Sequence, residues 1–160
     1  MHILRYSLCL LLLVTGLAAT AAGGDGNNEA PTGLWLTEKK DTVVRIERCG
    51  GELCGYITWI HPDEEQVTPD GEPMCGQKVL WGFERSSSKP GLWQGGHIYR
   101  ADKDKEYSGR LHLRDDGTLR LRGYIGLPFL GKSYTLSRVQ ESDYPACEAT
   151  TSNTRGTSNG

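Results

Sequence analysis

The chain has 160 residues, of which 37% are hydrophobic and 24% charged, and its formal net charge is −2. This length suffices for one domain with a small core. The slight excess of acidic side chains argues against a general nucleic-acid binder.

Residues 1–22 have the pattern of an export signal. Arg5 supplies the positive start, an apolar run follows over residues 8–17, and small residues predict cleavage after Ala21 or Ala22. The run is too short to span a bilayer comfortably, and no later stretch is apolar enough to do so. We therefore expect a soluble protein that is periplasmic or secreted.

Polar segments flank the predicted domain, which covers residues 31–147. A flexible linker is expected over residues 23–30 and a disordered tail over residues 148–160, because both are rich in small polar residues. The domain shows no convincing helical period and instead contains short, β-rich runs bounded by turn residues. These runs cover residues 33–38, 42–49, 53–60, 78–85, 92–100, 106–114, 118–125 and 131–139.

Strands of this number with short connections predict an all-β fold, an eight-stranded antiparallel up-and-down barrel whose closure removes exposed edges. Trp35 in the first run and Arg138 in the last form the predicted closing pair. The indole would fill the barrel floor with the guanidinium stacked on its face, a cation–π contact worth about 0.5–2 kcal/mol. We expect both residues to be structural and Trp35→Ala to destabilise the fold.

Two disulfides are predicted from the four cysteines that remain after Cys9 leaves with the signal. A bridge between Cys49 and Cys54 would set these two residues opposite each other in a hairpin, with Ile46 opposite Ile57. This register gives one apolar and one polar face, as a half-buried hairpin requires. The second bridge, Cys75–Cys147, follows by elimination. Zinc is the competing interpretation, but no C-x-x-C pair is present, and we expect no metal.

A second register follows from the turn at residues 115–117. A three-residue loop with Gly117 left-handed pairs Leu113 with Leu119 and continues the apolar face, whereas a two-residue loop would destroy it. On the other face this register sets basic side chains opposite one another. The predicted basic patch consists of Arg110, Arg114, Arg120 and Arg122.

Four stretches of the domain resemble a known family. They are GLWLT (33–37), VVRIERCGGELCGYITWI (43–60), GLWQGGHIYRADKDKEYSGRLHL (91–113) and LRLRGYIGLPFLGKSYTLSR (119–138). Their motifs, W-x-G-G-x-I-Y and L-x-x-D-G-x-L-x-x-x-G-Y above all, are similar to those of the exported bacterial proteins of domain of unknown function 2147 (DUF2147). The resemblance implies a calycin-like barrel, related in shape to lipocalins, and no established activity.

The chain departs from the family pattern at two places. Leu136 stands where the family often has a tryptophan, two residues before the closing arginine. Met74-Cys75-Gly76 stands near the Asp-x-x-Asn-Pro segment that is common in the long loop of the family. That loop, residues 61–77, also carries acidic side chains. We expect a solvated loop there, the alternatives being a cation site or a lid.

The barrel interior is the main candidate site, because a barrel of this size can hold either its own side chains or one small ligand. Pairing Tyr99 with Tyr107 would turn a set of aromatic residues and one histidine inward. The predicted ligand-binding residues are Trp59, Trp93, His97, Tyr99 and Tyr107. The alternative is that these side chains only fill the core.

Three functions follow in order. The first is a non-enzymatic barrel that binds a small, partly apolar ligand, without a cofactor. The second is an interaction module whose basic patch binds an anionic component of the cell envelope, although nearby acids at positions 102, 104 and 106 could neutralise the patch instead. An enzyme is third, because the sequence contains no catalytic motif.

Overall fold

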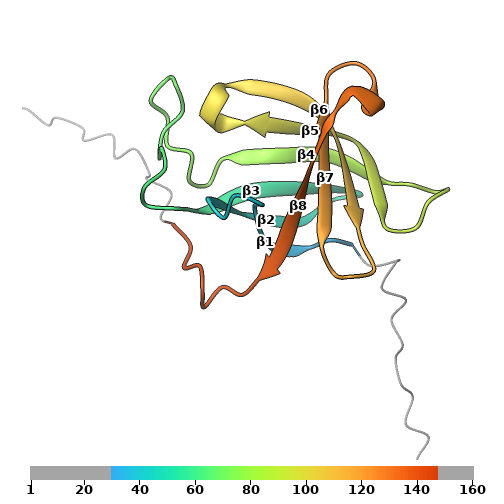
Figure 1. Ribbon diagram of the computed structural model, residues 1–160, viewed down its shortest axis with the longest axis horizontal. Helices are drawn as coiled ribbons and strands as arrows, with labels where there is room; N and C mark the ends of the chain where they lie inside the picture. The colour runs from blue at the N-terminus through green and yellow to red at the C-terminus, as the bar shows by residue number, and fades with distance from the viewer. Residues whose placement is uncertain (1–29, 148–160) are drawn as a thin grey trace, which may run out of the picture.

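Eight antiparallel strands close into a barrel in the computed structural model, and each strand pairs with its neighbours in sequence (Figure 1). The last strand returns to pair with the first, which completes the closure. The predicted all-β up-and-down barrel is thereby confirmed. The strands are β1 (Gly33–Leu36), β2 (Thr42–Cys49), β3 (Glu52–Ile60), β4 (Lys78–Arg85), β5 (Leu92–Arg100), β6 (Lys105–Leu113), β7 (Leu119–Tyr124) and β8 (Lys132–Val139).

The structure describes residues 30–147. The predicted export signal, all of the predicted linker except Ala30, and the predicted tail lie outside this range. Two short 3-10 helices, η2 (Ala101–Lys103) and η3 (Pro128–Leu130), lie in connections at the same end of the barrel. Within the described range there is no helix with the length and apolar content needed to cross a bilayer.

Apolar side chains fill the middle of the barrel. Phe83 on β4 is completely buried, and its ring lies against the backbones of β5 and β6. A Cβ atom added at Gly96 would lie 2.3 Å from this ring, and one added at Gly109 would lie 2.8 Å from it. Glycine at both positions therefore lets the two strands approach Phe83, whose ring fills the centre of the barrel.

The predicted closing pair joins β1 to β8. Trp35 is opposite Arg138 in the strand pairing, and the Arg138 guanidinium carbon lies 4.4 Å from the centroid of the buried indole. The Trp35 indole nitrogen donates a hydrogen bond to the Pro31 carbonyl (2.9 Å), and Arg138 donates one to the Thr32 carbonyl (2.7 Å). The pair therefore fixes the segment before β1 as well as the strand itself.

The β6–β7 hairpin has the predicted register. Leu113 pairs with Leu119 and Leu111 with Leu121, and Gly117 in the turn has φ +78°. The three-residue turn therefore keeps the leucines on the inner face, as the sequence indicates.

The β2–β3 hairpin contains the predicted Cys49–Cys54 disulfide, but in a register shifted by two residues. Cys49 pairs with Glu52, and Cys54 pairs with Glu47, so the bridge joins diagonal rather than directly opposed positions. The physical reason is the tight turn, where Gly50 has φ +70°. An even shift keeps side chains on their predicted faces. An irregularity between Val43 and Val44 changes the register by one further along, so that Trp59 pairs with Val43 instead of Val44 and leaves the inner face shared by Val44 and Ile57, contrary to the prediction.

The β5–β6 pairing differs from the predicted register by one residue. Ile98 rather than Tyr99 pairs with Tyr107, because an irregularity between Trp93 and Gly96 changes the register along β5. A change by an odd number exchanges the two faces of a strand. His97 and Tyr99 therefore lie on the outer face of β5, contrary to the prediction.

The Cys75–Cys147 disulfide is also present, with the two Cα atoms 6.1 Å apart. It joins the segment after β8 to the long β3–β4 loop. The Cys147 amide also donates a hydrogen bond to the Thr58 carbonyl of β3 (2.7 Å). The C-terminal segment is thus fixed against the barrel wall.

Candidate functional site

The five residues predicted to line a ligand site do not form a single site, and of the five only His97 and Tyr107 line a common depression. Trp93 is inside the barrel and only 2% exposed, with Arg48 over its ring at 5.6 Å. Trp59 packs edge-on against Tyr144 (5.0 Å) and His61 (5.8 Å), next to the C-terminal segment. These two tryptophans contribute to packing at separate places.

Tyr107 is the member of the predicted set that lies at the open end of the barrel. It is half-buried, packs against the hydrophobic core and is the third residue of β6, close to η2. Tyr99, on the other face of its strand, donates a hydrogen bond from its hydroxyl to Asp104 (2.9 Å). This hydrogen bond is the main cause of a raised pKa of Tyr99.

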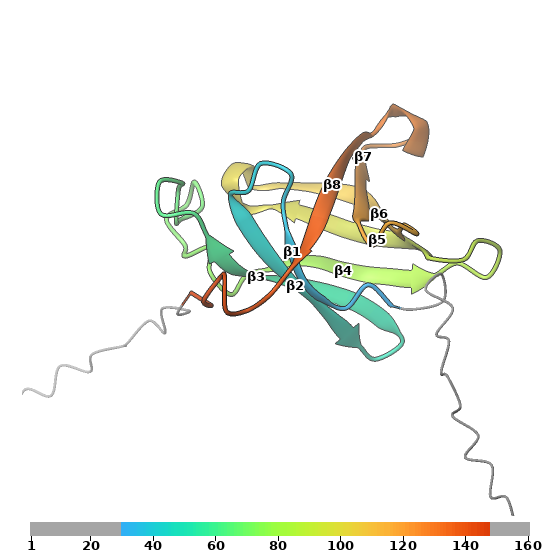
Figure 2. The same cartoon turned by 60° about the horizontal axis from the view of Figure 1, so that its bottom comes forward.

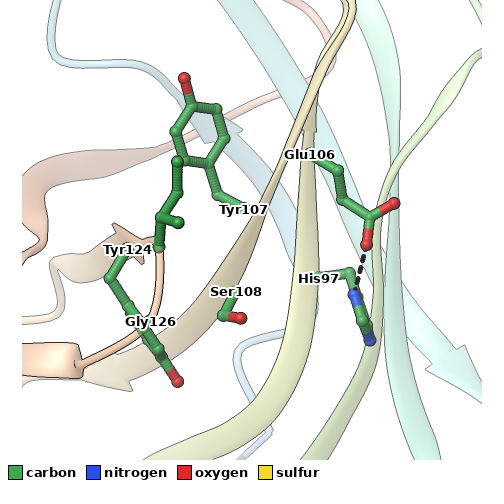
Figure 3. A pocket seen from close by; sticks show the side chains of 7 residues that line it. His97, Glu106, Tyr107, Ser108, Tyr124 and Gly126 are labelled. Atoms are coloured by element: carbon green, nitrogen blue, oxygen red, sulfur yellow. Dashed lines mark hydrogen bonds and ion pairs between the residues drawn. The ribbon is translucent and has the colours of Figure 1, made fainter.

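A shallow depression of about 180 Å³ lies on the outer face of β5, β6 and β7, where it is lined by His97, Glu106, Ser108 and Tyr124 among others (Figure 3). His97 Nδ1 is 2.6 Å from a Glu106 carboxylate oxygen, and the imidazole stacks on Trp81 with centroids 5.4 Å apart. Among the described residues no hydrogen bond joins Ser108 to His97, so the nucleophile–base contact of covalent catalysis is not formed here.

The β6–β7 register places the basic side chains of the predicted patch opposite one another, as expected. Arg110 is opposite Arg122, and His112 is opposite Arg120. The acids that could have neutralised the patch bind elsewhere: Asp102 to Arg100, Asp104 to Tyr99, and Glu106 to His97. Within residues 30–147 no carboxylate forms a salt bridge with any of the four arginines of the patch.

The pKa of His112 is lowered first by burial and then by the positive charges on this face, those of Lys89, Arg114 and Arg120. The side chains of Arg114 and Arg120 are exposed, whereas Arg110 is partly buried and lies 5.9 Å from the Tyr124 ring. Arg114 and Arg120 are therefore the members of the patch that can meet an external anion.

Arg122 has a structural role that the sequence did not indicate. Its guanidinium donates hydrogen bonds to the Pro128 carbonyl (2.7 Å), the Phe129 carbonyl (3.0 Å) and the Ser133 hydroxyl (2.9 Å). One side chain of β7 therefore holds the whole β7–β8 connection in place.

The β7–β8 connection carries an exposed apolar cluster, which we call the apolar tip. Its side chains are Ile125 (73% exposed), Leu127 (55%), Phe129 (72%) and Leu130 (69%). Single exposed apolar residues are common in proteins, but a contiguous group of this kind marks an interaction surface. The sequence signal was present as an apolar run between Gly123 and Gly131, but residues 126–130 were predicted only as the connection between two strands and no function was drawn from them.

The sequence pattern of a family described as "Uncharacterized protein conserved in bacteria (DUF2147)" matches residues 33–138. The chain belongs to this family. The match begins at Gly33 and ends at Arg138, so the DUF2147 region coincides with the barrel from the start of β1 to the closing arginine. The apolar tip and the basic patch both lie inside it.

A solved structure with the same fold is protein HP1028 from the human pathogen Helicobacter pylori, which its description places in the lipocalin family. It is 16% identical to this DUF2147 protein, with a TM-score of 0.57, over 71% of this chain and 86% of that one. At this level of identity the likeness shows the fold. No curated protein matches the chain in sequence.

The residues expected to depart from the family pattern are part of the packed structure. Leu136 is 2% exposed and belongs to the core, so a smaller side chain fills this place beside β7. Met74 is also buried, and Cys75 forms the disulfide to Cys147. The loop residues of this DUF2147 member therefore stabilise the loop.

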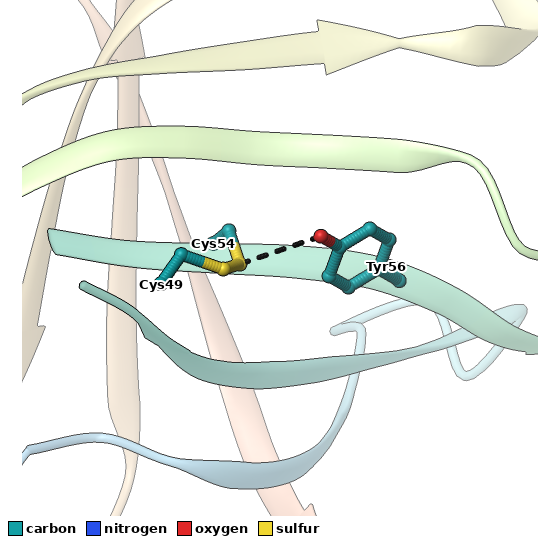
Figure 4. The surroundings of a disulfide bond; sticks show 3 residues. All are labelled: Cys49, Cys54 and Tyr56. Carbon is teal, nitrogen blue, oxygen red and sulfur yellow. Dashed lines mark hydrogen bonds between the residues drawn. A yellow bond between two sulfur atoms is a disulfide. The ribbon is translucent and has the colours of Figure 1, made fainter.

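Glu47, Cys49 and Cys54 bring three potential metal-ligand atoms within 4.8 Å of one another. Both sulfur atoms belong to the disulfide, and the Tyr56 hydroxyl lies 3.6 Å from the sulfur atom of Cys54 (Figure 4). A disulfide sulfur is not a thiolate and does not bind zinc in the usual way. This group is therefore explained as a disulfide and its surroundings.

Proposed function

We propose that this DUF2147 protein is a non-enzymatic, exported barrel that binds a small, partly apolar ligand at its open end. The observation that carries the proposal is the contrast between the two ends. Trp35 and Arg138 close one end, whereas the other presents the partly buried Tyr107 and Leu121 and the 41% exposed Tyr134.

A polar group accompanies this apolar rim. Arg100 forms an ion pair with Asp102, and the pKa of Arg100 is raised chiefly by that hydrogen bond, with Tyr134 and Tyr107 acting in the same direction. An amphiphile could place its apolar part against the tyrosines and Leu121 and its polar head near this ion pair. Because Phe83 fills the centre, the ligand would remain at the rim.

Export is part of the proposal. The pattern of residues 1–22, the membership in a bacterial family and two disulfides all favour an oxidising compartment such as the periplasm. Of the ligand-binding residues predicted from the sequence, the proposal uses Tyr107, and it adds Leu121, Tyr134 and Arg100.

Native mass spectrometry and solvent extraction of the protein purified from the periplasm test ligand binding. We expect a co-purifying small amphiphile, and we expect Tyr134→Ala to reduce its occupancy because this exposed side chain forms part of the rim. Tyr144→Ala, which lies beside Trp59, is the matched control and should retain the ligand. A bare polypeptide mass with nothing in the extract would refute the proposal.

A second function, binding of an anionic envelope component through the basic patch, is favoured by the engagement of Asp102, Asp104 and Glu106 elsewhere. The double variant Arg114→Glu/Arg120→Glu should lose salt-sensitive binding to anionic envelope fractions. Lys39→Glu/Arg85→Glu makes the same change of charge at other exposed positions and should bind normally. Equal binding by both double variants would exclude the patch.

A further inference from the structure

The apolar tip projects from the end of the barrel. In Figures 1 and 2 the β7–β8 connection, with η3 within it, extends beyond the neighbouring strands in both views. Its four large apolar side chains are between 55% and 73% exposed, whereas most other large apolar side chains of residues 30–147 are buried. The tip thus presents a convex apolar surface.

Five backbone polar groups of the tip form hydrogen bonds within the protein, namely the carbonyls of residues 127–129 and the amides of residues 130 and 131. Arg122 binds the carbonyls of Pro128 and Phe129, the Leu130 amide donates to the Leu127 carbonyl, and the Gly131 amide donates to the Pro128 carbonyl. A peptide group that enters an apolar medium without a partner costs several kcal/mol. These internal bonds remove much of that cost and hold the connection in one shape.

The charge of the hairpin is one-sided. The strands and connection of the hairpin, residues 119–139, contain no Asp or Glu, and the two basic residues next to the tip are Arg122, which binds its carbonyls, and Lys132. Lys132 is exposed and directly follows the tip. Glu38 contacts the hairpin further along β8, at the Thr135 amide. An apolar tip with basic residues behind it is complementary to an anionic bilayer, where apolar groups enter the acyl boundary and cations meet headgroups.

We propose that the β7–β8 hairpin docks this protein on an anionic lipid bilayer, with Ile125, Leu127, Phe129 and Leu130 entering the outer part of the leaflet. The occupant is a lipid surface because the hairpin combines a convex apolar tip with an excess of positive charge. This docking surface is distinct from the ligand rim and from Arg114 and Arg120 on the barrel wall, and it does not depend on either proposed function.

Vesicle co-sedimentation of the protein purified from the periplasm tests the docking. Vesicles of phosphatidylethanolamine and phosphatidylglycerol should bind the protein, and phosphatidylcholine vesicles should bind it less. The double variant Phe129→Ser/Leu130→Ser should weaken binding about tenfold or more, because two large apolar side chains no longer leave water. Val67→Ser is a matched control, since Val67 is 40% exposed on the β3–β4 loop, and it should bind like the parent.

Insertion itself is measured with Phe129→Trp and brominated lipids. The added tryptophan should be quenched by the bromine atoms and shift its emission to the blue, relative to the parent protein with its four native tryptophans. The inference is overturned if the added tryptophan is not quenched, or if the double serine variant binds vesicles as the parent does. It is also overturned if the tip instead mediates self-association in sedimentation without vesicles, which would assign the surface to a second copy of the chain.

Discussion

Gly33 shows how a single backbone position controls the barrel closure. Its φ is +119°, a conformation that residues with a side chain rarely adopt, and a Cβ atom here would lie 2.7 Å from a terminal nitrogen of Arg138. Glycine at this place therefore allows the guanidinium to reach both the indole of Trp35 and the Thr32 carbonyl. The Gly-x-Trp pattern and the arginine at the far end of the domain form one structural unit.

Gly33→Ala should destabilise the protein by about 1–3 kcal/mol, since it adds backbone strain and displaces Arg138. Urea unfolding followed by tryptophan fluorescence measures the change. Gly51→Ala is the control, because a Cβ at Gly51 has nothing within 4 Å. Similar losses of stability in both variants would mean that the closing pair is not sensitive to the side chain at position 33.

His112 should make stability depend on pH. Its pKa is lowered from 6.5 by burial and by neighbouring cations, so the folded state takes up a proton less readily than the unfolded state. Above pH 6.5 both states are neutral and the histidine costs nothing. As the pH falls from 6.5 towards the lowered pKa, only the unfolded state gains protons, and stability decreases.

Urea unfolding at several pH values between about 5 and 7.5 tests this behaviour, with His112→Gln expected to flatten the pH dependence. His61→Gln is the comparison, since His61 lies on the exposed β3–β4 loop. A pH dependence that is unchanged by His112→Gln would assign it to other groups.

At the scale of elements, the hairpins show what a sequence can determine. The β6–β7 register was predictable because only one turn length keeps leucine opposite leucine, and an odd error would have placed arginines in the core. The β2–β3 register was off by two because an even shift preserves both faces, so the hydrophobic pattern could not detect it. In β5 the glycine pair at positions 95 and 96 marks an irregularity, but glycine alone does not say by how many residues the register changes, and the change placed His97 and Tyr99 outside.

The candidate site was predictable only in part for the same reasons. Tyr107 was found because it alternates along β6 with Leu111 and Leu113, whose inner face was predicted correctly, whereas the rim depends on contacts of Tyr134 and Arg100 between different strands. The apolar tip resembles a buried strand end in sequence, and its exposure depends on how Arg122 folds the connection. The sequence pattern alone does not determine which groups that guanidinium binds.

Arg122→Gln should loosen the β7–β8 connection without unfolding the barrel. It removes hydrogen bonds to two carbonyls and to Ser133. Hydrogen exchange should show faster exchange of the Leu130 and Gly131 amides, because their turn is no longer fixed. Arg120→Gln on the same strand is exposed and should leave these amides unchanged. Equal exchange in the two variants would show that Arg122 does not hold the tip.

At the scale of the whole molecule, the two disulfides constrain very different lengths of chain. Cys49 and Cys54 are separated by 5 residues and Cys75 and Cys147 by 72. On the chain-entropy account, closing these loops stabilises the fold by about 2 and about 4 kcal/mol respectively. Reduction of both should therefore lower the melting temperature clearly.

Calorimetry of the Cys75→Ser/Cys147→Ser and Cys49→Ser/Cys54→Ser variants separates the two contributions. The first variant should lose more stability, because its open loop has more freedom in the unfolded state. The order would be reversed if the short bridge were required to form the β2–β3 hairpin. Unchanged melting in both variants would contradict the pairing.

The contact between Trp35 and Arg138 also has a kinetic consequence. The two residues are partners in the strand pairing although almost the whole domain lies between them in sequence. One edge of β1 therefore has no partner until β8 has been synthesised and has joined the sheet. Chains are made from the N-terminus, and β1 must wait with an open edge throughout. The β1–β8 pairing therefore cannot form before the last strand is present, and topologies dominated by such distant pairings fold in about milliseconds to seconds. During that interval the nascent sheet is the form of the protein most in need of protection from other chains.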